Sequence, residues 1–275
     1  MASEVMEREM YGGKFHVVHN PNARGRQARY TITNTETGEV TKPKGVTTII
    51  GKVIAKDLAG WAVGCAIEYL ESKLPVVTKD DLEIASHEYE NKRDKGANTG
   101  SEAHLLVERY LKGETVNTAD ASKEALNAYN AFVKWFEEVK PEVVNVEEVI
   151  YSAEFDYPGT YDCMLKIDGI VYLCDLKTTN SSKRAPMGVY AENFLQLGAY
   201  ANAHDEQAEY VLREKGEEIP KVEGLMVISA KKNGVLDIVT NEQLGISVDD
   251  CKTMWKRVCN IFSFLEFATN KLGGK

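Results

Sequence analysis

Apolar and polar residues alternate through residues 14–50, a pattern typical of β-strands with one buried face. The step Thr37-Gly38 separates two alternating runs and predicts the turn of a hairpin. Beyond residue 56 the apolar positions recur with a helical period, which places five residues on one face: Leu58, Trp61, Ala62, Cys65 and Tyr69. We therefore expect a β-rich segment followed by helices, with Trp61 packed in the core.

Four helices are expected before residue 140. They cover about 56–73, 79–93, 100–113 and 122–138. The residues that interrupt the helical pattern are Pro75, Gly96, Gly100, Gly113 and Pro141. In particular, Gly96 and Gly100 predict a break between the second and third helices.

The alternating pattern returns at residue 141. The next elements are three strands, a helix, two strands and a terminal helix, over about 142–152, 159–168, 169–179, 187–206, 222–230, 235–240 and 247–270. This order predicts an α/β (α+β) fold, in which helices flank a mixed central sheet. No segment has the composition of a linker, so we expect one domain over 1–275. Its parts would be an N-terminal β-hairpin and helical elaboration (1–95), a core (96–245) and a C-terminal helix (246–275).

The bulk composition narrows the class of protein. The formal net charge is −9, which argues against a general binder of polyanions but leaves room for local basic surfaces. The charged first ten residues do not resemble a signal peptide, and no apolar run approaches the ~20 residues of a membrane span. Five cysteines without a CxxC pair suggest reduced thiols. We expect a cytoplasmic protein without a membrane partner.

Acidic residues and a lysine lie near the end of the strand predicted over about 169–179. Asp175 and Lys177 are two residues apart and share a face of that strand. A tight turn at Asp168-Gly169 would place Asp162 of the preceding strand close to Asp175. Neighbouring carboxylates repel each other unless a cation lies between them, and oxygen ligands of this kind suit Mg²⁺ or Mn²⁺. A third acid is available in Glu147 or Glu148, and strand register decides between them.

These residues belong to a longer ordered set of motifs. The segments PGTYD (158–162) and DLKTT (175–179) resemble the two-part signature of the PD-(D/E)xK nuclease superfamily. The RecB-like branch also has Gly-x-x-x-His, Glu and Gln-x-x-x-Tyr elements, found here as Gly100 to His104, Glu147, and Gln196 to Tyr200. The similarity, which extends to phage and mitochondrial exonucleases of that branch, covers roughly residues 96–205.

The resemblance implies a restriction-endonuclease-like core that hydrolyses DNA phosphodiester bonds with a divalent metal. By this likeness, Lys177 would position the attacking water and Glu147 would be the third catalytic acid. The metal ligands would be the carboxylates of Asp162 and Asp175, the backbone carbonyl of Leu176 and His104, the last being a ligand or a phosphate contact. An exonuclease that acts on DNA ends, with single strands as a candidate substrate, is favoured over an endonuclease with the same site. A phage-type role in recombination, repair or replication, beside a single-strand-binding or annealing protein, fits this likeness.

Other residues are candidates for nucleic-acid contacts. Gln196 and Tyr200 share a helix face and would pack behind Lys177 or touch the nucleic-acid backbone. Thr178 and Thr179 could bond phosphate oxygens. Three arginines in a Gly/Asn-rich stretch could clamp the backbone: Arg24, Arg26 and Arg29.

Alternatives remain open at this stage. His104 could be a structural histidine, and Glu108, one turn later, could orient it or be solvated. Some family members hold an iron–sulfur cluster, but the scattered cysteines here do not fit one. A non-catalytic DNA-binding module would be expected to lack an acid or the lysine, and a small-molecule enzyme with a structural ion pair would not depend on divalent metals.

Overall fold

The computed structural model describes residues 4–24, 27–54, 58–179, 181–182 and 185–273. Within these ranges the strands form two sheets. The N-terminal sheet is antiparallel, in the order β1 (Met6–Met10), β2 (Phe15–His19), β3 (Tyr30–Asn34) and β4 (Val40–Thr41). The central sheet has the order β5 (Glu142–Ser152), β6 (Tyr157–Ile167), β7 (Ile170–Lys177), β8 (Gly224–Ala230) and β9 (Leu236–Thr240). Only β7 and β8 run parallel among these pairs, so the prediction of a mixed central sheet is confirmed.

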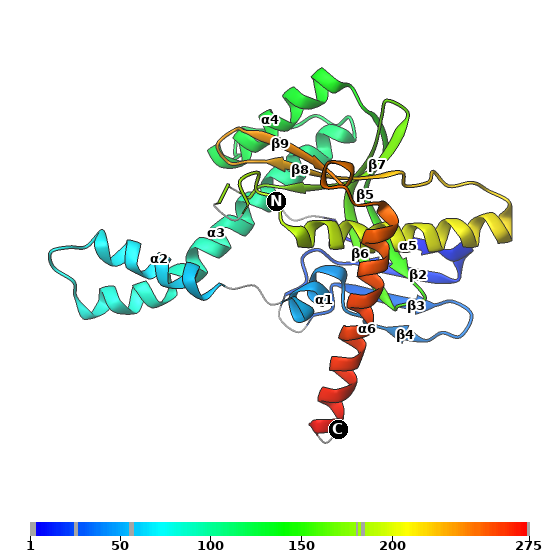
Figure 1. The fold of residues 1–275 in the computed structure, drawn as a ribbon, viewed down its shortest axis with the longest axis horizontal. Coiled ribbons are helices and arrows are strands. Elements are labelled where there is room, and N and C mark those ends of the chain that lie inside the picture. The colour runs from blue at the N-terminus through cyan, green and yellow to red at the C-terminus, as the bar shows by residue number, and fades with distance from the viewer. Residues whose placement is uncertain (1–3, 25–26, 55–57, 180, 183–184, 274–275) are drawn as a thin grey trace.

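Helices cover both faces of the central sheet (Figure 1). The described helices are α1 (Val46–Val53), α2 (Ala59–Glu71), α3 (Lys79–Leu111), α4 (Lys123–Val139), α5 (Ala191–Lys215) and α6 (Val248–Leu272), with short 3₁₀ turns at Tyr11–Gly13 and Glu242–Leu244. One buried cluster joins α1, α5 and α6 to the sheet, and a second joins α3 and α4 to its other face. The outcome is an α+β architecture with its core on both sides of one sheet.

Two predicted elements differ from the structure. The region predicted as β-rich ends in a helix, α1, because Val46, Ile49 and Ile50 have helical spacing and are all buried. The break expected at Gly96 and Gly100 is absent, since α3 continues through both glycines. Packing against the rest of the protein outweighs the weak helix propensity of glycine there.

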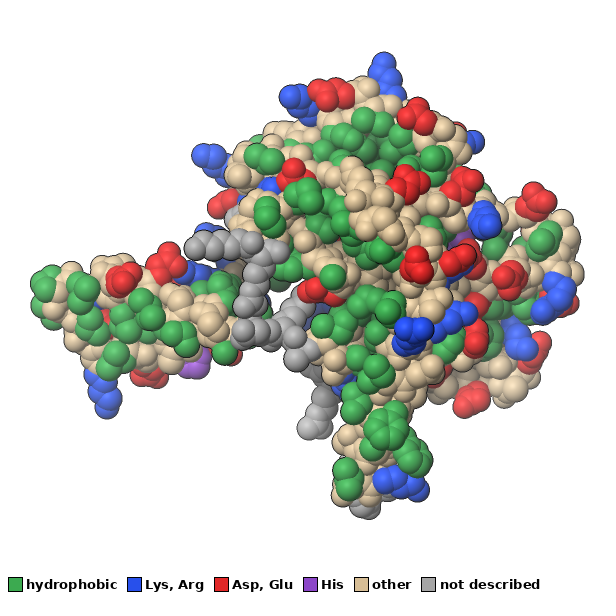
Figure 2. Space-filling view, in the orientation of Figure 1, with side chains coloured by type: hydrophobic (Ala, Val, Ile, Leu, Met, Phe, Trp, Pro, Cys, Tyr) green, Lys and Arg blue, Asp and Glu red, His purple; other side chains and the backbone are tan. Residues whose placement is uncertain are grey.

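A helical hairpin made of α2 and the first half of α3 extends away from the core (Figure 1). Trp61 lies on it with 42% of its surface exposed and contacts only the edge of Tyr89 among the described aromatic rings. The prediction that Trp61 is a core residue is therefore wrong. Further apolar side chains are exposed on this hairpin and on the projecting end of α6 (Figure 2), including Val63, Ile67, Leu82, Ile261, Phe264 and Phe267.

The N-terminal sheet packs on β5 and α5 through a third apolar cluster that includes Tyr11, Val17, Ile32 and Tyr151. This contact places the end of the β2–β3 hairpin against β6. None of the described helices has the length and apolar character needed to cross a membrane.

Candidate active site

The β6–β7 hairpin brings two acids together, as its turn predicts. Cys163 pairs with Cys174 in the antiparallel ladder, so Asp162 lies opposite Asp175 at the next position. The backbone N–H of Leu176 donates a 2.6 Å hydrogen bond to Asp162 Oδ2. Asp162 is therefore fixed at the end of the strand that carries Asp175.

An irregularity in β5 places Glu147, rather than Glu148, opposite Asp162. Val143 pairs with Leu165, and an unshifted strand would place Val146 opposite Asp162. The register shifts between Val143 and Asn145, and Glu147 comes to lie opposite Asp162 instead. Glu147 has a φ of +49°, a left-handed conformation that is costly for a non-glycine residue and is often found at functional sites. Glu148 points elsewhere and forms an ion pair with Arg8.

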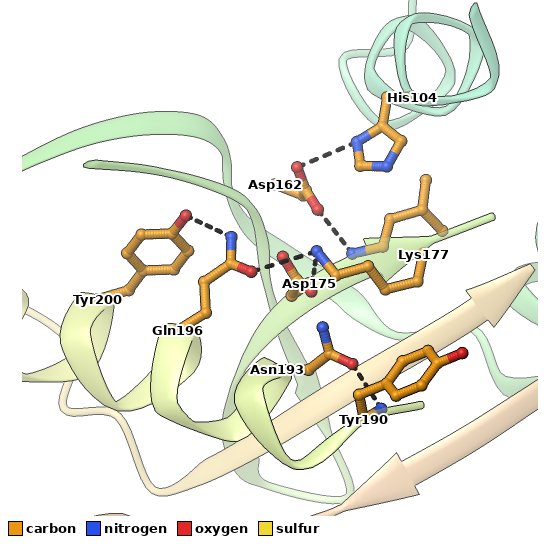
Figure 3. Close-up of polar contacts among 9 residues, drawn as sticks. His104, Asp162, Asp175, Lys177, Tyr190, Asn193, Gln196 and Tyr200 are labelled. Atoms are coloured by element: carbon orange, nitrogen blue, oxygen red, sulfur yellow. Dashed lines mark hydrogen bonds and ion pairs between the residues drawn. The ribbon is translucent and has the colours of Figure 1, made fainter. Parts of the chain in front are cut away.

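Helix α3 supplies the histidine. His104 Nδ1 lies 3.2 Å from Asp162 Oδ1 (Figure 3). One potential ligand atom from each of His104, Glu147 and Asp162 lies within 4.8 Å of the others. The same three residues line a small pocket whose inner wall is apolar, with Phe132 and Leu176. Glu108 also lines this pocket, but it pairs with Lys112 rather than with the imidazole.

A second polar chain adjoins this group (Figure 3). Lys177 Nζ lies 2.6 Å from Asp175 Oδ2 and donates a 3.3 Å hydrogen bond to Gln196 Oε1. Gln196 Nε2 in turn donates a 2.7 Å hydrogen bond to the Tyr200 hydroxyl. Tyr200 is only 3% exposed, so the pair packs behind Lys177, and the hydroxyl of Tyr200 does not face solvent where nucleic acid could reach it. Helix α5 thus holds the ammonium in place.

The charged state of Asp162 is stabilised by its neighbours. Burial would raise its pKa, yet the pKa lies below the usual value because His104 and Lys177 attract the carboxylate. The hydrogen bond from Leu176 N–H lowers it further. The same attraction raises the pKa of His104 in spite of burial.

The other two acids have raised pKa values. Burial raises the pKa of Asp175, which is 2% exposed, and repulsion from Asp162 adds to the rise while Lys177 opposes it. Burial raises the pKa of Glu147 to about 8, with Asp162 and Glu108 adding to the shift. The charged forms of these two acids are therefore destabilised, because the cations of the site do not fully compensate three neighbouring carboxylates.

A divalent cation would fit this set of donors. Two carboxylates and an imidazole within reach of one point could together hold a divalent metal ion. Asp175 Oδ2 is buried and, despite its ion pair with Lys177, accepts no well-directed hydrogen bond from the described residues. A buried carboxylate that has one lysine as its cationic partner and lies beside another acid is a position that a further cation would stabilise.

The remaining predicted residues lie around this centre. Thr178 is half-buried and Thr179 exposed at the end of β7, and Thr178 Oγ1 lies beside Gly100 of α3. Arg24 and Arg29 are exposed in the β2–β3 loop, while Arg26 lies outside the described residues. The structure records Leu176 through its N–H, and the predicted use of its carbonyl stays a prediction.

Three residues near the site make contacts that the sequence did not predict. Thr160 lies on β6, two residues before Asp162, and contacts Tyr30 and His19 of the N-terminal sheet. These contacts join residues 130 and 141 positions apart. Only the packing of one sheet on the other could reveal them.

Comparisons with known proteins assign the chain to no family. No family model and no curated protein matches the chain. Among solved structures, the chain is similar to a "putative exonuclease" from Eubacterium rectale, with 16% sequence identity and a TM-score of 0.29. That similarity covers 59% of this chain and 68% of the other.

Proposed function

We propose that this protein is a divalent-metal-dependent deoxyribonuclease that hydrolyses phosphodiester bonds. The observation that carries the proposal is the convergence of His104, Glu147 and Asp162 on one point, beside the buried Asp175–Lys177 pair. The elements that meet there are α3, β5, β6 and β7, from separate parts of the sequence. A structural ion pair alone would not require two further acids and a strained Glu147.

The residues of the chain have distinct roles in this proposal. His104, Glu147 and Asp162 would hold the cation, with Asp175 and the Leu176 carbonyl as further ligands. When bound, Mg²⁺ or Mn²⁺ would neutralise charge on the phosphate and acidify a water. Lys177, held between Asp175 and Gln196, would orient the attacking water or stabilise charge on a phosphate oxygen. Thr178 and Thr179, at the rim, would donate hydrogen bonds to the adjoining phosphate.

The finer assignment is an exonuclease that acts on DNA ends, in phage-type recombination, repair or replication. It follows from the motif resemblance to RecB-like exonucleases over residues 96–205. An endonuclease with the same centre differs in how DNA reaches the site. Comparison of circular, linear and end-blocked DNA distinguishes the two, because only an end-dependent enzyme spares the circle.

The central test is cleavage by matched lysine variants. Lys177→Met should lower the cleavage rate by about 10²-fold or more, the usual effect of losing a group that stabilises transition-state charge. Lys166→Met is the control, because Lys166 is an exposed lysine on the neighbouring strand β6. EDTA should abolish cleavage by the unmodified protein, and Mg²⁺ or Mn²⁺ should restore it. Cleavage that persists in EDTA, or full activity of Lys177→Met, would contradict the proposal.

A further inference from the structure

Three polar side chains join the N-terminal sheet to β6 beside the proposed centre. The Tyr30 hydroxyl lies 3.1 Å from Thr160 Oγ1, and His19 Nδ1 lies 3.4 Å from the same oxygen. The rings of Tyr30 and His19 are stacked, with centroids 4.5 Å apart and an interplanar angle of 11°. Both residues are buried, at 8% and 6% exposure. We refer to Thr160, Tyr30 and His19 as the Thr160 node.

The node is adjacent to the proposed metal ligands. Thr160 and Asp162 are two residues apart on β6, so they share a face of the sheet and lie about 7 Å apart along the strand. Electrostatics agrees with this placement. Burial raises the pKa of Tyr30, Thr160 and Arg29 lower it, and Glu147 contributes to the rise. The Tyr30 hydroxyl is therefore within electrostatic reach of both Glu147 and Arg29.

The node also fixes both ends of the β2–β3 loop. His19 and Tyr30 are partners in the ladder, and the N–H of Asn20 donates a 2.8 Å hydrogen bond to the carbonyl of Arg29. The side chain of Arg29 is exposed, and its charge lowers the pKa of His19 in addition to the larger effect of burial. The backbone of Arg29 is thus fixed directly beside the node, and its side chain is exposed to solvent.

We propose that the Thr160 node makes the N-terminal sheet one wall of the substrate path, where it positions Arg29 to bind a backbone phosphate flanking the cleaved bond. This inference rests on the proposed nuclease function and names a positioning device for it. A planar guanidinium suits a phosphate because it can donate two parallel hydrogen bonds. A chain with a net charge of −9 must place its cations along the path of the substrate to hold DNA at all.

The binding test compares Arg29→Ala with Lys14→Ala. Lys14 lies at the other end of β2 in the same sheet and pairs with Glu36, so it serves as a matched control. Binding of fluorescein-labelled single-stranded and duplex DNA is measured in EDTA over a range of salt concentrations. Loss of one phosphate contact should reduce the slope of log Kd against log salt by about 1 in Arg29→Ala. Lys14→Ala should keep the slope of the unmodified protein.

The kinetic test uses Tyr30→Phe, which removes only the hydroxyl that reaches Thr160. A positioning role predicts that KM rises about fivefold, as expected for the loss of one ordinary hydrogen bond, while kcat is unchanged. A purely structural role would lower the melting temperature without this separation of KM from kcat. An unchanged salt slope in Arg29→Ala, or an unchanged KM in Tyr30→Phe, would overturn the inference. If the inference about Arg29 fails in this way but Lys177→Met is inactive in the same assays, the proposed nuclease function still stands. An active Lys177→Met would contradict both the nuclease function and the inference that rests on it.

Discussion

At the scale of single residues, the balance between burial and charged or hydrogen-bonding partners sets the pKa of each acid in the candidate site. Asp162 and Asp175 are neighbours, yet their pKa values move in opposite directions. Asp162 has His104 and a backbone N–H as partners, whereas Asp175 is deeply buried and has Lys177. Two carboxylates in different environments can hold different protonation states at one pH, which is how acid and base roles are separated in enzymes.

Protonation of His19 should make the free energy of unfolding depend on pH. Burial, and then Arg29, lower its pKa from 6.5 to about 4. Between these values the unfolded chain binds more protons than the folded one, so stability is lost as the pH falls from about 6.5 to about 4. The loss attributable to His19 is about 3 kcal/mol at most. Urea unfolding of the wild type and His19→Gln at pH 7, 5.5 and 4 should show a difference that shrinks toward acid pH. Parallel curves would contradict this explanation.

At the scale of elements, local signals predicted the site and long-range packing completed it. The Asp168-Gly169 turn fixes the β6–β7 register, so the proximity of Asp162 and Asp175 could be predicted from adjacent residues. The register of β5 could not, because it depends on a shift near residue 144 that has no turn residue to announce it. Strand β1 could not be predicted for a different reason. Only one of its positions is fully buried, so it has no alternating buried face.

Helix α3 shows why the position of the His104 side chain could not be predicted from the sequence. Two glycines predict a break before His104, and a broken helix would leave its side chain unplaced. In the folded protein, a Cβ on Gly100 would lie 3.1 Å from Thr178 Oγ1, which is closer than most real contacts. Glycine therefore allows α3 to approach the end of β7, and His104 follows one turn later.

The two glycines of α3 should respond differently to alanine. A Cβ on Gly96 would meet only Lys232 Nζ, at an ordinary 3.6 Å, so Gly96→Ala should stabilise the protein by about 0.5–1 kcal/mol with unchanged cleavage. Gly100→Ala should gain less stability and cleave several-fold more slowly, because Thr178 and α3 must move apart. Thermal unfolding and cleavage rates of both variants decide the matter. Equal stabilities and equal cleavage rates of the two variants would show that the close approach of α3 to Thr178 has no role in cleavage.

At the scale of the whole molecule, a polar network couples the N-terminal sheet to the central sheet and α5. Glu206 of α5 accepts hydrogen bonds from Ser152 Oγ at 2.7 Å, Asn202 Nδ2 at 2.6 Å and the Tyr11 hydroxyl at 3.1 Å. The Tyr11 hydroxyl, which has one proton to share between its acceptors, also lies 2.8 Å from the carbonyl oxygen of Tyr151. Residues from the N-terminal sheet region, β5 and α5 thus share one carboxylate, which favours unfolding of the sheets as a unit.

Removal of this carboxylate should test whether residues 1–275 form one cooperative domain. Glu206→Ala would leave several partly buried donors without an acceptor and should cost about 3 kcal/mol. Glu209→Ala, an exposed glutamate one turn later on α5, should change stability by less than about 0.5 kcal/mol. Calorimetry should show a single transition in each case, lowered as a whole only in Glu206→Ala. A separate early transition of the N-terminal sheet would mean that it folds independently, and the Thr160 node would then be a contact between two domains.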